Sequence, residues 1–189
     1  MLLSRTGAGD APATLTSADF AGMLRVMKTR LVFLHGLESG PHGSKYQALL
    51  EIDPDVIAPD CSGLDRIAER LLVIERCLEA VEKMVLVGSS FGGLAALLFA
   101  QRPANRERVA GCLLCAPAIS LAAPGEITWV PPNTIVLQGS QDDLVPWPES
   151  EAFCNEHHLE FILVDDDHRL SNSRPRVVEI ARLLLENFQ

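Results

Sequence analysis

The chain lacks two features that would direct it to a membrane or to a nucleic acid. No apolar run approaches the ~18 residues that span a bilayer, and basic residues are in the minority, with 16 Lys and Arg against 25 Asp and Glu. The formal net charge of −9 disfavours binding to nucleic acid or to an anionic membrane surface. We therefore expect neither of them as a partner.

The N-terminus also lacks the cationic segment and the long apolar stretch of a secretory signal. The five cysteines are an odd number, and most lie inside apolar runs, which favours reduced, buried thiols over a disulfide framework. Cys112 and Cys115 have C-x-x-C spacing, but on a strand their side chains point to opposite faces and cannot share a metal ion. These features predict a cytoplasmic protein with no metal.

Short apolar runs rich in β-branched residues alternate with helix-like segments. The runs are RLVFLH, DVIAP, KMVLVG, VAGCLLC, NTIVLQG and EFILVD, and the helix-like segments cover residues 44–51, 64–80, 91–101, 149–157 and 174–187. Continuous apolar runs are typical of parallel strands that are covered on both faces. The pattern predicts an α/β protein with a doubly wound, mostly parallel, six-stranded sheet and helices on both faces.

The length of 189 residues suits one domain with a substantial core. Residues 1–26 show no clear periodicity, so we expect a loose or peripheral N-terminal tail before a single domain over residues 27–189, with Met27 as the biological start. The segment 91–101 is apolar around its whole circumference, which predicts a central, buried helix. Ser173 and Pro175 suit the start of the last helix.

The segment VLVGSSFGG places two serines directly behind an apolar run. Gly88, Ser90 and Gly92 match the pattern G-x-S-x-G, whereas Ser89 has no glycine at either flanking position. In this pattern a sharp turn from strand to helix exposes the serine oxygen, and the two glycines allow the chain to approach itself closely. The alternative is a serine that only caps the helix, and the position between a strand and a helix favours a nucleophile.

A nucleophilic serine needs a base that accepts its proton and an acid that orients the base. On a parallel α/β sheet these partners follow in the order Ser, acid, His, at the carboxyl ends of later strands. Asp142 and Asp143 follow NTIVLQ, and His168 follows EFILVD. The spacing therefore predicts a site of Ser90, His168 and one of these two aspartates.

The remaining histidines and the acidic run DDD have simpler interpretations. His157 and His158 suit a helix end that faces water, His35 suits a turn, and His42 lies in a Gly/Pro-rich loop that borders the expected site. The consecutive aspartates at 165–167 are more typical of a solvated acidic loop than of a metal site.

An oxyanion pocket needs two backbone N–H groups near the nucleophile. One comes from the residue after the serine, which is Phe91, and the other from the loop after the first strand. That loop reads HGLESGPHGSK, and Leu37 is the natural second donor.

These segments together resemble the α/β-hydrolase superfamily. LVFLHG resembles its first strand and oxyanion loop, VGSSFGG its nucleophile elbow, GSQDDLVP its acid loop and DDDHRL its histidine loop, although Asp167 stands where many relatives have glycine. In the family's acid loop the aspartate lies three residues after a glycine and three before a valine. Counted from Gly139 and Val145, that position is Asp142.

The resemblance covers residue 30 to the C-terminus, and HGLESGPHGSK with the short length is similar to small bacterial esterases of the YqiA type. It implies strand order 2-1-3-4-5-6, no cofactor and, because residues 116–132 are too short for a helical cap, a site open to solvent. Trp129 and Trp147 either line its rim or pack elsewhere.

The implied activity is that of a serine hydrolase acting on small-molecule esters or thioesters of short acyl chains, through an acyl-enzyme on Ser90. The alternatives are a non-catalytic binding protein on the same fold and a hydrolase for another acyl or C–C substrate class.

Overall fold

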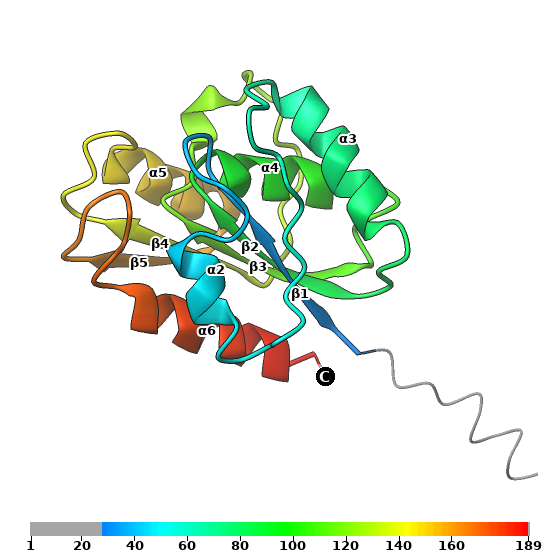
Figure 1. The fold of residues 1–189 in the computed structure, drawn as a ribbon. Helices are drawn as coiled ribbons and strands as arrows, with labels where there is room; N and C mark the ends of the chain where they lie inside the picture. The colour runs from blue at the N-terminus through cyan, green and yellow to red at the C-terminus, as the bar shows by residue number, and fades with distance from the viewer. Residues whose placement is uncertain (1–27, 189) are drawn as a thin grey trace, which may run out of the picture.

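A parallel sheet of five strands forms the centre of the part of the chain, residues 28–188, that this computed structural model describes. The strands are β1 (Arg30–Leu34), β2 (Met84–Ser89), β3 (Val109–Cys115), β4 (Thr134–Gly139) and β5 (Glu160–Val164), and they lie side by side in that order (Figure 1). The predicted tail over residues 1–26 and the predicted start at Met27 lie outside the described residues.

The prediction of a sixth strand at DVIAP is wrong in extent but correct in place. This segment lies beside β1, where the sequence order 2-1-3-4-5-6 requires it, yet only Ile57 pairs with Val32. Ile57 N–H donates to Leu31 O, and Ile57 O accepts from Phe33 N–H. The next donor of a parallel ladder would be residue 59, which is a proline without an N–H, so the pairing ends there.

Helices cover both faces of the sheet (Figure 1). One face carries α3 (Ile67–Leu78), α4 (Phe91–Ala100) and α5 (Trp147–His157), and the other carries α2 (Ser44–Leu49) and α6 (Arg174–Glu186). All ten residues of α4 are buried, as its apolar circumference predicts. Two apolar clusters follow, one on each side of the sheet, and they fix the strands from both faces.

Strand β3 separates the two thiols of the C-x-x-C motif. Cys112 packs in the cluster under α4, and Cys115 packs in the cluster under α6, so the predicted opposite orientation is confirmed. Burial raises the pKa of Cys112 to about 12 and that of Cys115 to about 11. Both thiols are therefore protonated packing residues at neutral pH.

The helices lie where the sequence predicts, with small shifts at their ends. Helix α3 begins at Ile67 rather than Leu64, and α5 begins at Trp147 rather than Glu149. Ser173 precedes α6, but its side chain makes no capping hydrogen bond.

Between residues 28 and 188 we find no helix with the length and apolar character to cross a membrane.

Candidate active site

The turn from β2 into α4 holds Ser90 in a strained backbone conformation. Its φ of 54° and ψ of −119° lie in a region that side chains other than glycine rarely adopt. Ser90 N–H donates to Cys115 O at 2.9 Å, and Ser90 O accepts from Gly93 N–H at 2.8 Å and Ala118 N–H at 3.1 Å. The strain is thus compensated by β3 and the loop that follows it.

The two glycines of the motif are required by close backbone contacts. A Cβ on Gly88 would lie 2.6 Å from Gly92 O, which is the mutual approach that the motif predicts. A Cβ on Gly92 would lie 2.0 Å from Leu34 O and 2.7 Å from His35 O. The second glycine therefore lets α4 begin directly against the end of β1, where the oxyanion loop starts.

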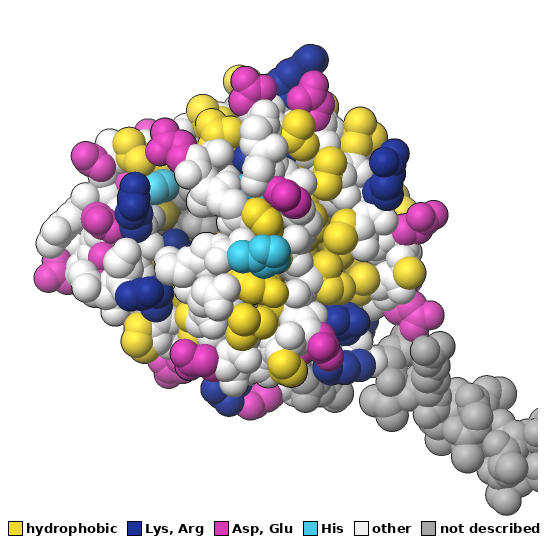
Figure 2. Space-filling model, in the orientation of Figure 1, with side chains coloured by type: hydrophobic (Ala, Val, Ile, Leu, Met, Phe, Trp, Pro, Cys, Tyr) yellow, Lys and Arg dark blue, Asp and Glu magenta, His cyan; other side chains and the backbone are white. Residues whose placement is uncertain are grey.

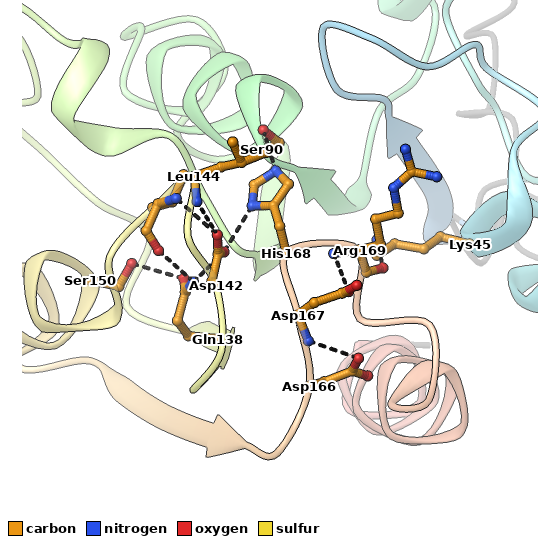
Figure 3. A network of polar contacts seen from close by, with 11 residues as sticks. Lys45, Ser90, Gln138, Asp142, Leu144, Ser150, Asp166, Asp167, His168 and Arg169 are labelled. Carbon is orange, nitrogen blue, oxygen red and sulfur yellow. Dashed lines mark hydrogen bonds and ion pairs between the residues drawn. The ribbon is translucent and has the colours of Figure 1, made fainter.

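The structure brings Ser90, His168 and Asp142 together from three separate loops (Figure 3). His168 Nδ1 lies 2.8 Å from Asp142 Oδ2, and His168 Nε2 lies 3.0 Å from Ser90 Oγ. An ionised carboxylate can only accept, so Nδ1 carries the proton and Nε2 presents its lone pair to the serine hydroxyl. Asp143 is exposed and makes no contact of this kind.

Asp142 is fixed by four hydrogen bonds. Its Oδ1 accepts from the N–H groups of Leu144 at 3.0 Å and Val145 at 2.8 Å, and its Oδ2 accepts from His168 and from Gln138 Nε2 at 2.6 Å. These bonds satisfy a carboxylate whose side chain is fully buried.

Gln138 is a site residue that the sequence analysis missed. It is fully buried in β4, donates also to Val145 O at 3.0 Å, and accepts from Ser150 Oγ at 3.0 Å (Figure 3). The available signal was a polar residue at the end of the apolar run NTIVLQ, in the last position before the acid loop.

The acidic segment 165–167 is not a uniformly solvated loop, and on this point the sequence interpretation is wrong. Asp166 is buried, and its carboxylate accepts from the N–H groups of Asp167, Asn172 and Ser173 at 2.8–2.9 Å. Burial alone would raise the pKa of this carboxyl, but these hydrogen bonds outweigh burial and hold the pKa below its ordinary value. Asp166 therefore organises the loop that carries His168.

Two further contacts connect the histidine loop to its neighbours. Lys45, which is buried in α2, donates from Nζ to Arg169 O at 2.7 Å (Figure 3). Gln141 N–H donates to Asp166 O at 3.0 Å, which joins the histidine loop to the acid loop. The base and the acid are thus held by elements from both faces of the sheet.

The predicted oxyanion donors lie at the same place. Leu37 and Phe91 line one cleft together with Ser90 and His168. A Cβ on Gly36 would lie 3.4 Å from Ser90 Cβ, so the Gly36–Leu37 peptide passes close to the serine. Phe91 is the first residue of α4, where an N–H has no acceptor within the helix.

His35 shapes the loop after β1, in agreement with the sequence interpretation. Its ring is buried; Nε2 accepts from Cys61 N–H at 3.0 Å, so the proton of the neutral ring lies on Nδ1, which donates to Gly36 O at 2.8 Å. Burial lowers the pKa of this imidazole. His42 does not line the cleft; its ring contacts Tyr46 with centroids 4.8 Å apart.

The cleft has a volume of about 560 Å³, and its lining mixes apolar, polar and charged side chains. Leu37, Leu121 and Leu144 line it from three loops, and their exposed fractions are 45%, 64% and 67%. Neither Trp129 nor Trp147 is among its lining residues. A larger open hollow lies between α2 and α6, and it contains none of Ser90, Asp142 and His168.

No group of three or more His, Cys, Asp or Glu side chains between residues 28 and 188 is arranged to hold a metal ion. The short connection after β3 contains only the 3₁₀ turn η1 (Ile119–Leu121) and no helical cap. The cleft is consequently open above Ser90.

A parallel, doubly wound sheet with a strained serine between strand and helix, and with an aspartate and a histidine on later loops, defines the α/β-hydrolase class of folds. The chain belongs to the alpha/beta hydrolase family, whose sequence profile matches residues 31–155. No curated protein matches the chain.

Solved structures share this fold over most of their length. A protein described as a hydrolase of the α/β superfamily, from Xanthomonas campestris, is 24% identical, with a TM-score of 0.69 over 86% of this chain and 99% of its own. Est1E from Butyrivibrio proteoclasticus is 17% identical, with a TM-score of 0.66 and coverages of 87% and 90%. A thermophilic esterase from Thermogutta terrifontis is 20% identical, with a TM-score of 0.61 and coverages of 85% and 90%.

Proposed function

We propose that this α/β hydrolase is a serine hydrolase that cleaves carboxylic ester or thioester bonds. The observation that carries the proposal is the continuous series of hydrogen bonds from Asp142 through His168 to Ser90 Oγ, which ends in an open cleft. This geometry suits removal of the hydroxyl proton at the moment of attack.

In the proposed reaction Ser90 Oγ bonds to the substrate carbonyl carbon while its proton moves to His168 Nε2. Asp142 stabilises the resulting imidazolium, and the N–H groups of Leu37 and Phe91 bind the carbonyl oxygen as it becomes negative. Collapse of this intermediate breaks the bond to the alcohol or thiol, which takes the proton from Nε2. Water then releases the acyl group by the same steps, and no cofactor takes part.

Three exposed leucines of the cleft support an apolar acyl or alcohol group on the substrate. Leu37, Leu121 and Leu144 offer apolar surface beside Ser90 without enclosing it, because no cap covers the site. Such an open site favours small esters and selects weakly among them. Figure 2 shows acidic and basic side chains interspersed over the face drawn there, which suits a small-molecule substrate better than a nucleic acid. The five cysteines are all free thiols, and only Cys77 is exposed, which supports a cytoplasmic location.

A fluorophosphonate probe tests the proposal directly, with the modified residue mapped by peptide mass spectrometry. We expect label on Ser90 in the wild type, none in Ser90→Ala, and a label that falls sharply in His168→Ala. Ser89→Ala is the matched control and should keep its label. A folded wild-type protein that takes no label would overturn the proposal in favour of a non-catalytic binding protein.

A panel of p-nitrophenyl esters and acyl thioesters of increasing chain length then defines the substrate class. We expect the highest kcat/KM for short acyl chains. A labelled enzyme that cleaves none of them would direct the search to other acyl or C–C substrates.

A further inference from the structure

Arg70 is a buried cation directly behind the oxyanion loop. It extends from α3, its side chain is almost fully buried, and none of the ion pairs formed among residues 28–188 includes it. A buried cation without a carboxylate is costly unless other groups compensate its charge. Burial lowers the pKa of this guanidinium, but an arginine remains protonated in proteins. Arg70 therefore fixes a positive charge in the interior.

The contacts of Arg70 lead to both expected oxyanion donors. Its Nη1 donates to His35 O at 2.8 Å, its Nη2 donates to Gly36 O at 3.2 Å, and its Nε donates to Leu64 O at 2.7 Å. The guanidinium carbon also lies 5.1 Å from the centroid of the Phe91 ring. One side chain thus touches the loop before Leu37 and the residue after the nucleophile.

The bond to Gly36 O has a direct electronic effect, because Gly36 C=O and Leu37 N–H belong to the same peptide group. Hydrogen bonds accepted by a carbonyl polarise its peptide and strengthen the N–H as a donor. Gly36 O accepts from two groups, Arg70 Nη2 and His35 Nδ1. Both act on the peptide that presents the Leu37 N–H to the cleft.

We propose that Arg70 is a positioning residue for the oxyanion hole. It holds the Gly36–Leu37 peptide and Phe91 in place, so that their two N–H groups converge on the substrate oxygen, and it strengthens the Leu37 donor. The inference rests on the proposed serine-hydrolase function. Arg70 acts through these donors and does not touch the substrate, so its main effect falls on the transition state, where the negative charge develops.

Steady-state kinetics of Arg70→Met on p-nitrophenyl butyrate test this role. We expect kcat to fall about 10- to 100-fold, somewhat less than for loss of an oxyanion donor, while KM changes less than about threefold. A trifluoromethyl ketone, which forms a tetrahedral oxyanion with Ser90, should lose affinity by the same factor as kcat. The matching amide, which forms no oxyanion, should bind as to the wild type.

Arg70→Lys keeps the charge but cannot reach three carbonyls, so we expect a kcat between those of the wild type and Arg70→Met. It also carries the test if Arg70→Met does not fold. The matched control is Arg108→Met. Arg108 likewise donates to backbone carbonyls, those of Leu78 and Val81, but it lies at the amino end of β3, away from the cleft at the carboxyl ends of the strands. We expect a lower Tm for this control and an unchanged kcat.

Folded Arg70 variants with wild-type kcat and wild-type affinity for the ketone would overturn the role. Equal losses of kcat in Arg70→Met and Arg108→Met would also overturn it, because a general loss of stability would then explain both. A wild-type protein that neither hydrolyses esters nor takes the fluorophosphonate label overturns the proposed function itself. An active wild type with unaffected Arg70 variants overturns only the role of Arg70.

Discussion

Strand β4 carries a buried polar side chain near each end, and the two side chains differ in what they contact. Thr134, at the amino end, donates from Oγ1 to Pro131 O at 2.7 Å, only three residues earlier in the chain. Gln138, near the carboxyl end, contacts Asp142, Val145 and Ser150. The first bond closes a local turn, whereas the second set holds the acid of the proposed triad.

The amino ends and the carboxyl ends of the other strands differ in the same way, and we call these two sides of the sheet its amino edge and its carboxyl edge. At the amino edge Asn105 donates to Phe99 O in α4, and Arg108 donates to Val81 O in the loop after α3. These bonds stabilise the ends of helices and the loops that follow them. At the carboxyl edge the contacts of His35, Arg70 and Gln138 continue toward the cleft. Polar groups are buried at both ends of the strands, but at the carboxyl ends their contacts lead to the hydroxyl of Ser90.

The largest effect is expected at Gly92, where the carboxyl edge is most crowded. Gly92→Ala would place a Cβ 2.0 Å from Leu34 O, so the backbone of the elbow or of β1 must move. We expect a loss of about 3 kcal/mol in the free energy of unfolding and no detectable esterase activity. Urea denaturation and p-nitrophenyl butyrate turnover measure the two effects.

Gly40→Ala is the control for this crowding, because the nearest atom to an added Cβ is 3.7 Å away. We expect it to change stability by less than about 0.5 kcal/mol. Equal destabilisation by both substitutions would mean that the close approach at Gly92 is not what requires glycine.

Gln138→Met should lower esterase activity, whereas a substitution at the amino end of β4 should not. Methionine has a similar volume but cannot donate to Asp142 or Val145, so the carboxylate and the imidazole lose part of their alignment. We expect kcat/KM to fall about 10- to 100-fold, measured on p-nitrophenyl butyrate with folding checked by circular dichroism.

Thr134→Val is the matched substitution at the other end of the strand. It removes the bond to Pro131 O and should cost about 1 kcal/mol in the free energy of unfolding, with kcat/KM unchanged. If it lowers kcat/KM as much as Gln138→Met does, the functional distinction between the two edges fails.

The smallest effect concerns the pH dependence of stability. Burial lowers the pKa of His35 from its ordinary value of 6.5; the nearby charge of Arg70 adds to this shift, and the hydrogen bond to Gly36 and the charge of Asp60 oppose it. The unfolded chain takes up a proton near pH 6.5, whereas the folded protein does so only at lower pH. The stability from neutral His35 is therefore complete above about pH 6.5 and is lost as pH falls through the folded pKa.

Urea denaturation between pH 7.5 and 5.5 measures this loss. We expect His35→Asn, which can still donate to Gly36 O, to lose less stability over this range than the wild type loses. The exposed His42→Asn serves as control, and its pH profile should match that of the wild type. Identical profiles for all three proteins would contradict a neutral, buried His35.

Much of this molecule was predictable because its signals are local. The continuous apolar runs predicted a parallel sheet, and the glycines around Ser90 and the place of His168 after the last strand predicted residues that the structure brings together. The order of the strands was implied by the family resemblance. The extra strand at DVIAP was not excluded, because an apolar run alone does not show that Pro59 ends its pairing with β1.

Local sequence patterns were enough to predict the class of fold, the turn at Ser90 and the order in which acid and base follow it, since each depends on residue type and spacing within a few positions. The side chains that support these residues became visible in the packed structure alone. Arg70 is 34 residues from Gly36, and Lys45 is 124 residues from Arg169. Such contacts arise from how helices pack across the sheet, and no local pattern encodes them.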